Sequence, residues 1–232
     1  MHTSMPMDDG RPPMPGMTQG PGGAPGMIHT EVFLSGDTLE VELVGGPGFS
    51  ETDDPMAGVV MRQGAGFAAP FDVLNDKFFN GQYGWLPSSQ PGNELQSLPI
   101  ELVIGVELIG IDTDASGTLE TYDGGNGMQL RPTDANGDLL PTLHTMQPLF
   151  TQIGDVWLWE DFVMQHNWYA ATRPGDYRVT YEVFVSDRSG VRDLAYGSDT
   201  ISLDFTVVPE PAALLSGAGI SLAMLRRREA RA

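Results

Sequence analysis

The feature that most constrains the fold is a two-residue alternation of apolar and polar side chains that returns along the chain. It is clearest in segment 38–44, where leucine or valine occupies one side and glutamate much of the other. A period of two is typical of a strand with one buried face. Runs of this kind, or short apolar runs, occur at 28–34, 38–44, 58–62, 99–110, 118–122, 156–163, 176–187 and 201–207.

Glycine and proline separate these runs, and the turn residues Ser35-Gly36-Asp37 predict that the first two form a β-hairpin. Segment 71–79 suits one or two helical turns, and segment 81–92 is rich in turn residues. A parallel α/β sheet would need helical segments of about 10 residues between strands, and the sequence has none. We therefore predict an all-β fold, a single antiparallel β-sandwich of the immunoglobulin or jelly-roll kind, over residues 28–208.

Residues 1–27 have a different composition, with prolines, glycines and methionines in place of alternating apolar residues. Such a segment cannot bury a core, so we predict a disordered leader. An exported protein begins with basic residues followed by an apolar stretch of about 7–15 residues, which this segment does not contain. For an exported protein we expect a signal peptide upstream of Met1. The alternative is a cytoplasmic protein with a chance C-terminal pattern.

The chain is strongly acidic, with 31 Asp and Glu against 12 Lys and Arg and a formal net charge of −19. A surface of this sign repels nucleic acid, which argues against a DNA- or RNA-binding function. It attracts divalent cations and basic partners. Cysteine is absent, which excludes disulfides, zinc–thiolate sites and a cysteine nucleophile.

The last 24 residues form a separate unit, the tail 209–232. Pro209-Glu210-Pro211 interrupts regular structure, residues 212–225 are apolar or small, and Arg226, Arg227 and Arg228 follow. As a short hydrophobic helix, 212–225 would span about 21 Å, less than the ~30 Å hydrocarbon core of a bilayer. The arginines favour the cytoplasmic side. An ordinary amphipathic helix, the alternative, would have a charged face, and this segment has none.

The tail resembles the PEP-CTERM sorting signal of Gram-negative bacteria. This resemblance implies transient membrane insertion through 212–225, recognition by a membrane protease of the exosortase type, removal of the tail, and delivery to the cell surface or extracellular matrix. Tails of this kind have also been named ice-binding protein C-terminal domains, a name that assigns no activity. Our first hypothesis is an exported, non-catalytic surface or matrix protein.

Two further segments, 28–44 and 164–208, resemble a β domain of bacterial surface-anchored wall proteins. The matching residues are His29 at the start of the first hairpin, His166-Asn167-Trp168, and Arg173-Pro174-Gly175-Asp176-Tyr177. In the last of these, Pro174-Gly175 suits a tight turn in which glycine takes a positive φ. The family element is rich in histidine, whereas Met164 and Gln165 precede His166 here.

Three histidines, His29, His144 and His166, would suffice for a zinc site if the fold brought them together with an acidic residue. No pair has the short spacing that makes such a signal specific. The simpler interpretation is that His166 and Trp168 pack or hydrogen-bond beside the Pro174-Gly175 turn.

Asp112, Asp114 and Ser116, with Gly117 after them, have the spacing of the first positions of an EF-hand loop, which predicts a candidate calcium site. The acidic residue expected at the last position would be Asp123, which is shorter than the usual glutamate. A second acidic segment, 134–138, is shorter still. The alternative for both is a turn in which Asp or Asn oxygens accept backbone N–H groups.

Aromatic residues gather in one stretch: Trp157, Trp159, Trp168 and Tyr169. Exposed rings of this kind stack against sugars, so our second hypothesis is a carbohydrate-binding module or lectin, with calcium as a possible cofactor. The alternative is that these residues are core.

Support for catalysis is small, because the chain lacks the Gly-x-Ser-x-Gly, His-Glu-x-x-His and phosphate-binding motifs. Acidic pairs such as Asp53-Asp54 and Glu160-Asp161 keep a secreted hydrolase as a third hypothesis. We assign no catalytic residue and expect no enzyme.

Overall fold

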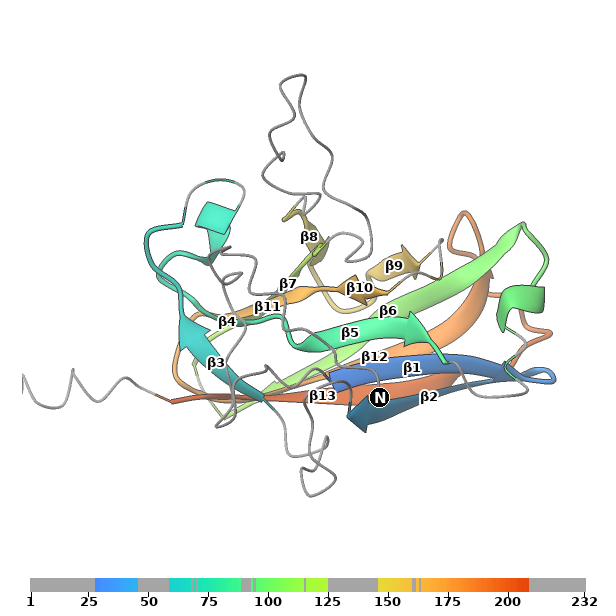
Figure 1. The fold of residues 1–232 in the computed structure, drawn as a ribbon, viewed down its shortest axis with the longest axis horizontal. Coiled ribbons are helices and arrows are strands. Elements are labelled where there is room, and N and C mark those ends of the chain that lie inside the picture. Colours follow the sequence, from blue (N-terminus) through green and yellow to red (C-terminus); the bar gives the residue numbers. More distant parts are fainter. Residues whose placement is uncertain are drawn as a thin grey trace, which may run out of the picture.

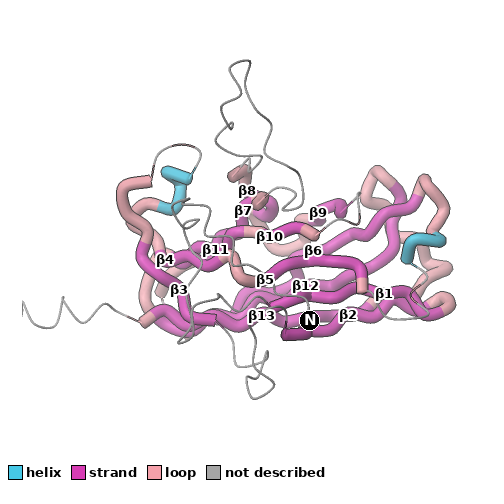
Figure 2. Tube along the Cα trace, viewed as in Figure 1, coloured by secondary structure: helices cyan, strands magenta, loops and turns pink. Residues whose placement is uncertain are grey.

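The structure is a computed structural model that describes residues 28–45, 59–67, 69, 71–88, 93, 95–114, 116–124, 146–159, 162 and 164–208. Most of them are in strands, and the predicted all-β class is confirmed. The helical segments are the short 3₁₀ turns η2 (Phe71–Leu74) and η3 (Leu95–Ser97), which lie at opposite ends of the molecule in Figure 2. The predicted leader 1–27 and the tail 209–232 lie outside the described residues.

Within the part of the chain that is described, no helix is long and apolar enough to span a membrane.

The strands form two sheets, which can be followed in Figure 1. The smaller sheet has the order β10 (Gln165–His166), β5 (Tyr83–Pro87), β1 (Ile28–Ser35), β2 (Thr38–Gly45). The larger has the order β8 (Pro148–Phe150), β7 (Leu119–Tyr122), β11 (Trp168–Ala171), β4 (Phe78–Asn80), β3 (Val59–Gln63), β13 (Asp199–Val207), β12 (Gly175–Asp187), β6 (Leu102–Thr113), β9 (Val156–Trp159).

The nine-stranded sheet is nearly closed and barrel-like. Its end strands β8 and β9 are joined by the turn 151–155 and lie next to each other. The turn is fixed to β6, because Leu108 donates its N–H to the Asp155 carbonyl (3.0 Å) and accepts one from Gly154 (2.8 Å). The concave face of this sheet therefore surrounds an interior, and the smaller sheet packs against that face.

Two strand pairs are parallel, so the prediction of a purely antiparallel sheet is wrong. Strand β5 pairs parallel with β1, and β3 pairs parallel with β13. A tight hairpin forces its two strands to be antiparallel, as in β1–β2. By contrast, β5 follows β1 only after β2, β3 and β4, so the chain has room to return in the same direction.

The two sheets share one hydrophobic core. Tyr83 of the smaller sheet meets Phe205 with ring centroids 5.3 Å apart, and Trp85 meets Tyr181 at 5.8 Å. The Trp85 Nε1–H also donates to the Tyr169 hydroxyl (3.3 Å). A second, smaller core covers the other face of β4 and β11 and includes Leu74 of η2, Phe79, Tyr122, Met146, Trp168 and Ala170.

Candidate functional site

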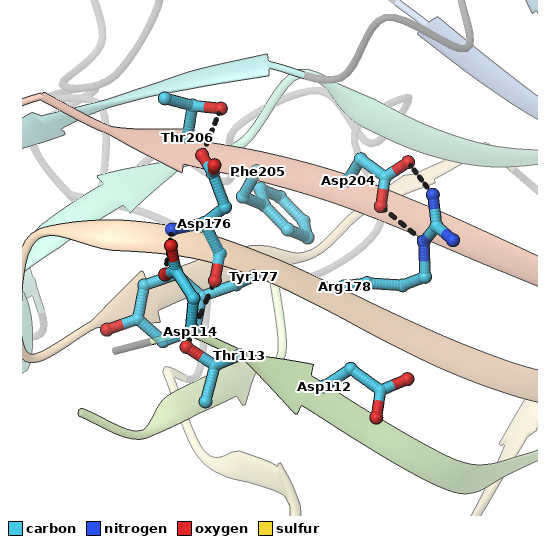
Figure 3. A pocket seen from close by; sticks show the side chains of 9 residues that line it. All are labelled: Asp112, Thr113, Asp114, Asp176, Tyr177, Arg178, Asp204, Phe205 and Thr206. Atoms are coloured by element: carbon cyan, nitrogen blue, oxygen red, sulfur yellow. Dashed lines mark hydrogen bonds and ion pairs between the residues drawn. The ribbon is translucent and has the colours of Figure 1, made fainter. Parts of the chain in front are cut away.

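The ends of three long strands form a shallow depression of about 550 Å³ on the outer side of the nine-stranded sheet, shown in Figure 3. We call it the acidic depression and define it by Asp112 of β6, the neighbouring Asp114, Asp176 and Arg178 of β12, and Asp204 of β13. The register of the sheet explains this gathering, because Arg178 lies opposite Asp112 on one side and Asp204 on the other.

One acidic residue of the depression is neutralised by its neighbour. Arg178 donates from Nε to Asp204 Oδ1 (2.7 Å) and from Nη2 to Asp204 Oδ2 (2.8 Å). The hydrogen bonds to Asp204, with the negative charge of Asp204 and Asp112, raise the pKa of Arg178. The lining contains no second basic side chain to balance the three other carboxylates, which belong to Asp112, Asp114 and Asp176. The depression is therefore electronegative.

Asp114 links the end of β6 to the start of β12, 62 residues away in the chain. Its Oδ1 accepts the backbone N–H of Asp176 (2.9 Å), whose own Oδ1 accepts a hydrogen bond from the Thr206 hydroxyl (2.8 Å). Asp112 lies inside strand β6, whereas an EF-hand ligand of this kind begins a loop. Across the described residues, no group of three or more His, Asp or Glu is arranged to hold a metal ion. Calcium binding by Asp112, Asp114 and Ser116 remains a prediction, and segment 134–138 lies outside the described residues.

Asp176 follows a bend at residues 172–174, where the sequence predicted a tight turn at Pro174-Gly175. Gly175 has φ +142°, a region in which a side chain is strained, so the expected positive φ is confirmed. The Tyr177 hydroxyl donates to the carbonyl of Arg173 (2.8 Å), four residues back, and burial raises the pKa of Tyr177. This bond resembles the tyrosine corner of immunoglobulin-like sandwiches. It fixes the start of β12 and hence the rim of the depression.

Three of the four aromatic residues proposed for sugar stacking are buried: Trp159 is 2% exposed, Trp168 5% and Tyr169 0%. Trp159 and Tyr169 belong to the main core and Trp168 to the second core, as the alternative interpretation held. Trp157 is only partly buried and stacks on Trp159, with ring centroids 6.4 Å apart. Stacking on a ligand needs an exposed ring face, so Trp157 is the one of the four that can offer one.

The structure brings together two of the three histidines. His29 of β1 and His166 of β10 both lie opposite Gly84 of the intervening strand β5, so they occupy one row of the small sheet. The His29 Nε2 atom is buried without a hydrogen-bond partner among the described residues. Burial lowers the pKa of His29, and the charge of Glu31 partly opposes this. His144 lies outside the described residues, and two imidazoles fall short of the usual zinc ligand set.

A second pocket, of about 440 Å³, was not suggested by the sequence. It lies between β6, β7 and the turn after β8, and its lining includes four threonines, Thr113, Thr118, Thr121 and Thr151. These residues come from separate segments, and threonine is common in strands, so no spacing or motif could have indicated them. We call it the threonine pocket.

No family model matches the chain, and comparison with curated proteins and with solved structures gives no match either.

Proposed function

We propose that this is an exported, non-catalytic protein of the cell surface or extracellular matrix, sorted by its C-terminal tail. The observation that carries the proposal is the sequence of residues 209–232, which combines Pro209-Glu210-Pro211, a short apolar run and terminal arginines. In this proposal the partner is a membrane protease of the exosortase type, which cuts near Pro209–Pro211 and releases the β domain.

The end of the described fold is compatible with such a cut. Strand β13 ends at Val207, which pairs with Gly175 of β12 and with Met61 of β3, and the next residue, Val208, is 56% exposed. A cut at Pro209–Pro211 therefore falls beyond β13 and removes no residue from these pairings. Proteolysis close to a folded domain requires accessible backbone, and the exposure of Val208 is consistent with that requirement.

The same proposal assigns a role to each part of the tail. The run 212–225 is too short for a durable anchor, so it inserts only transiently, while Arg226–Arg228 hold the C-terminus on the cytoplasmic side. The β domain, which we propose to be a two-layer sandwich akin to the surface-anchored wall-protein domain, is then outside. Its net negative charge keeps it soluble there.

The experiment is fractionation of a bacterium that processes signals of this class. The full chain with a signal peptide should appear outside the membrane in a shortened form. Its Glu210→Ala variant, and the unchanged chain in a strain without the exosortase, should accumulate at full length in the membrane. Equal release of all three would contradict the proposal.

Carbohydrate binding is a second candidate function, favoured by the partly exposed Trp157 stacked on Trp159. In this alternative, calcium at Asp112, Asp114 and Ser116 assists binding. Calcium titration followed by thermal melting tests that part: a rise in Tm that Asp112→Ala abolishes would support the calcium site.

A further inference from the structure

Strands β6 and β7 are consecutive in the chain, yet they do not pair with each other. They are joined by the segment 114–118 and diverge from it, since β6 pairs with β12 and β9 while β7 pairs with β11 and β8. The threonine pocket fills the space between them (the strands can be followed in Figure 1). It is bordered by β6, β7 and the turn after β8.

The floor of this pocket is apolar. Leu108, Leu119, Phe150 and Val179 all belong to the main core, and Ile111 packs against it. These side chains come from four strands that surround the pocket, so their positions are fixed by the sheet itself. A ligand that enters meets a preformed hydrocarbon surface, which favours a partner with an apolar face.

The rim supplies a hydrogen-bond acceptor. The Thr151 hydroxyl donates to Asp155 Oδ2 (2.7 Å). A hydroxyl has one hydrogen and two lone pairs, so an oxygen that has donated can still accept. A ligand that presents a hydrogen-bond donor to Thr151 is therefore favoured.

The strand edges add both donors and acceptors. In the described part of the chain, β9 covers β6 only over Ile104–Glu107, and no strand pairs with the same edge over residues 109–112. Likewise β8 covers β7 at Thr121 and Tyr122 but not at residues 119–120. Backbone N–H and C=O groups that point to these edges meet no paired strand among the described residues, so a ligand can bond to them. A ligand with hydroxyl groups, which both donate and accept, meets this requirement.

The charge of the lining favours a neutral ligand. Glu120 is the one ionisable side chain in it, and Lys77 pairs with this carboxylate. Burial opposes the ionised form of Glu120, but hydrogen bonds from Lys77 and Tyr122 outweigh it, so the pKa of Glu120 is lowered. The carboxylate is thus already matched by a cation, and the lining offers no cation to an anionic ligand.

We propose that the threonine pocket binds one sugar unit of a neutral glycan, with the C–H face of the ring on Ile111 and Phe150 and its hydroxyls on the threonine rim and the open strand edges. The pocket volume of about 440 Å³ lies within the ~300–1,000 Å³ typical of ligand sites. This inference does not depend on the sorting proposal, and it places sugar binding in a pocket whose lining does not include Trp157.

The test is a titration of isotope-labelled full-length protein, followed by amide proton–nitrogen correlation spectra. The probes are glucose, galactose, mannose and N-acetylglucosamine, with glucuronate as the charged comparison. We expect at least one neutral sugar to shift amides around Ile111, Thr118 and Ile153, and glucuronate to bind at least about tenfold more weakly. Shifts confined to the surroundings of Trp157, or no shift with any neutral sugar, would overturn the proposal.

Two variants on one strand sharpen the test. Ile111→Phe enlarges a side chain that lines the pocket, whereas Ile109→Phe enlarges one that does not. We expect Ile111→Phe to weaken binding about tenfold or more and Ile109→Phe to leave it unchanged. Equal binding by both folded variants would also overturn the proposal. If Ile111→Phe does not fold, the amide shifts of the unaltered protein still show whether sugar binds in the threonine pocket. Because release from the membrane is measured separately, failure here leaves the sorting proposal standing.

Discussion

At the scale of single residues, His29 is a buried titratable group whose surroundings disfavour its charged form. It is 9% exposed, and its Nε2 atom has no hydrogen-bond partner among the described residues. His166 lies in the same row across Gly84, and Glu31, two residues along β1, is the nearby negative group. Protonation of His29 would therefore place a poorly compensated charge in the sheet.

This environment predicts a pH dependence of stability. Because burial lowers the pKa of His29 below its usual value of about 6.5, the unfolded chain binds the proton first as pH falls. The contribution of His29 is complete above about pH 6.5 and is lost as pH falls from there toward the folded-state pKa. The slope is at most about 1.4 kcal/mol per pH unit.

Urea unfolding of the wild type and of His29→Gln between about pH 7 and 5 measures this pH dependence of stability. The range lies above the ordinary pKa of carboxylates, so Asp and Glu contribute little to the change. The wild type should lose more free energy of unfolding than the variant over this range. Parallel curves for the two proteins would show that His29 does not carry the effect.

At the scale of elements, Arg192 ties the segment after β12 to two strands. Its Nη1 lies 2.5 Å from Glu182 Oε1, its Nη2 lies 3.7 Å from Glu107, and its guanidinium sits 4.2 Å from the centroid of the Phe184 ring. The hydrogen bonds from Arg192 and Ser198 lower the pKa of Glu182 to about 2. One side chain thus links β6, β12 and the turn between β12 and β13.

We expect Arg192→Met to reduce the free energy of unfolding at pH 7 by about 1.5–3 kcal/mol, the range for hydrogen bonds to charged groups. The loss should shrink as pH falls from about 4.5 toward 2, because protonated Glu182 no longer attracts the arginine.

The matched variant is Arg178→Met. In the wild type, Arg178 forms a bidentate pair with Asp204, but the Arg178 side chain is 57% exposed. A surface pair of this kind contributes little, so this variant should lower the free energy of unfolding less than Arg192→Met does. Denaturant unfolding of both decides; an equal effect of the two substitutions would refute the role given to Arg192.

Strands with one covered face were easier to predict from the sequence than short strands with two covered faces. The hairpin β1–β2 followed from alternation and from Ser35-Gly36-Asp37, and Gly36 indeed has φ +59°. By contrast, β11 is buried at all four residues, between the main and second cores, so its sequence does not alternate. Strand β5 escaped prediction for a similar reason, since Tyr83, Gly84 and Trp85 are all buried.

Only some residues of the acidic depression could be predicted from the sequence. Asp112 and Asp114 stood out because they are two residues apart, but Asp176 and Asp204 join them through strand register. That register depends on an irregularity opposite Thr180 and Tyr181, where Ile109 is an extra residue in β6. A bulge shifts which side chains face each other, and nothing in the local sequence fixes its position.

At the scale of the whole molecule, we propose separate roles for the folded domain and the sorting tail 209–232. The described fold begins at Ile28, whose N–H donates to the Gln82 carbonyl (3.1 Å), and its last strand ends at Val207. A chain shortened after Val208 should therefore keep the pairings of β13 with β12 and β3. We expect its unfolding temperature to equal that of the full chain, as measured by circular dichroism. A large decrease would mean that the tail belongs to the fold.

The central claim is that the tail is a sorting signal removed during export. Intact-mass spectrometry of the protein recovered from outside a processing host tests it most directly. We predict a C-terminus near Pro209–Pro211, without the segment 212–225 and without Arg226–Ala232. Recovery of the same protein with its C-terminal arginines still attached would contradict the claim.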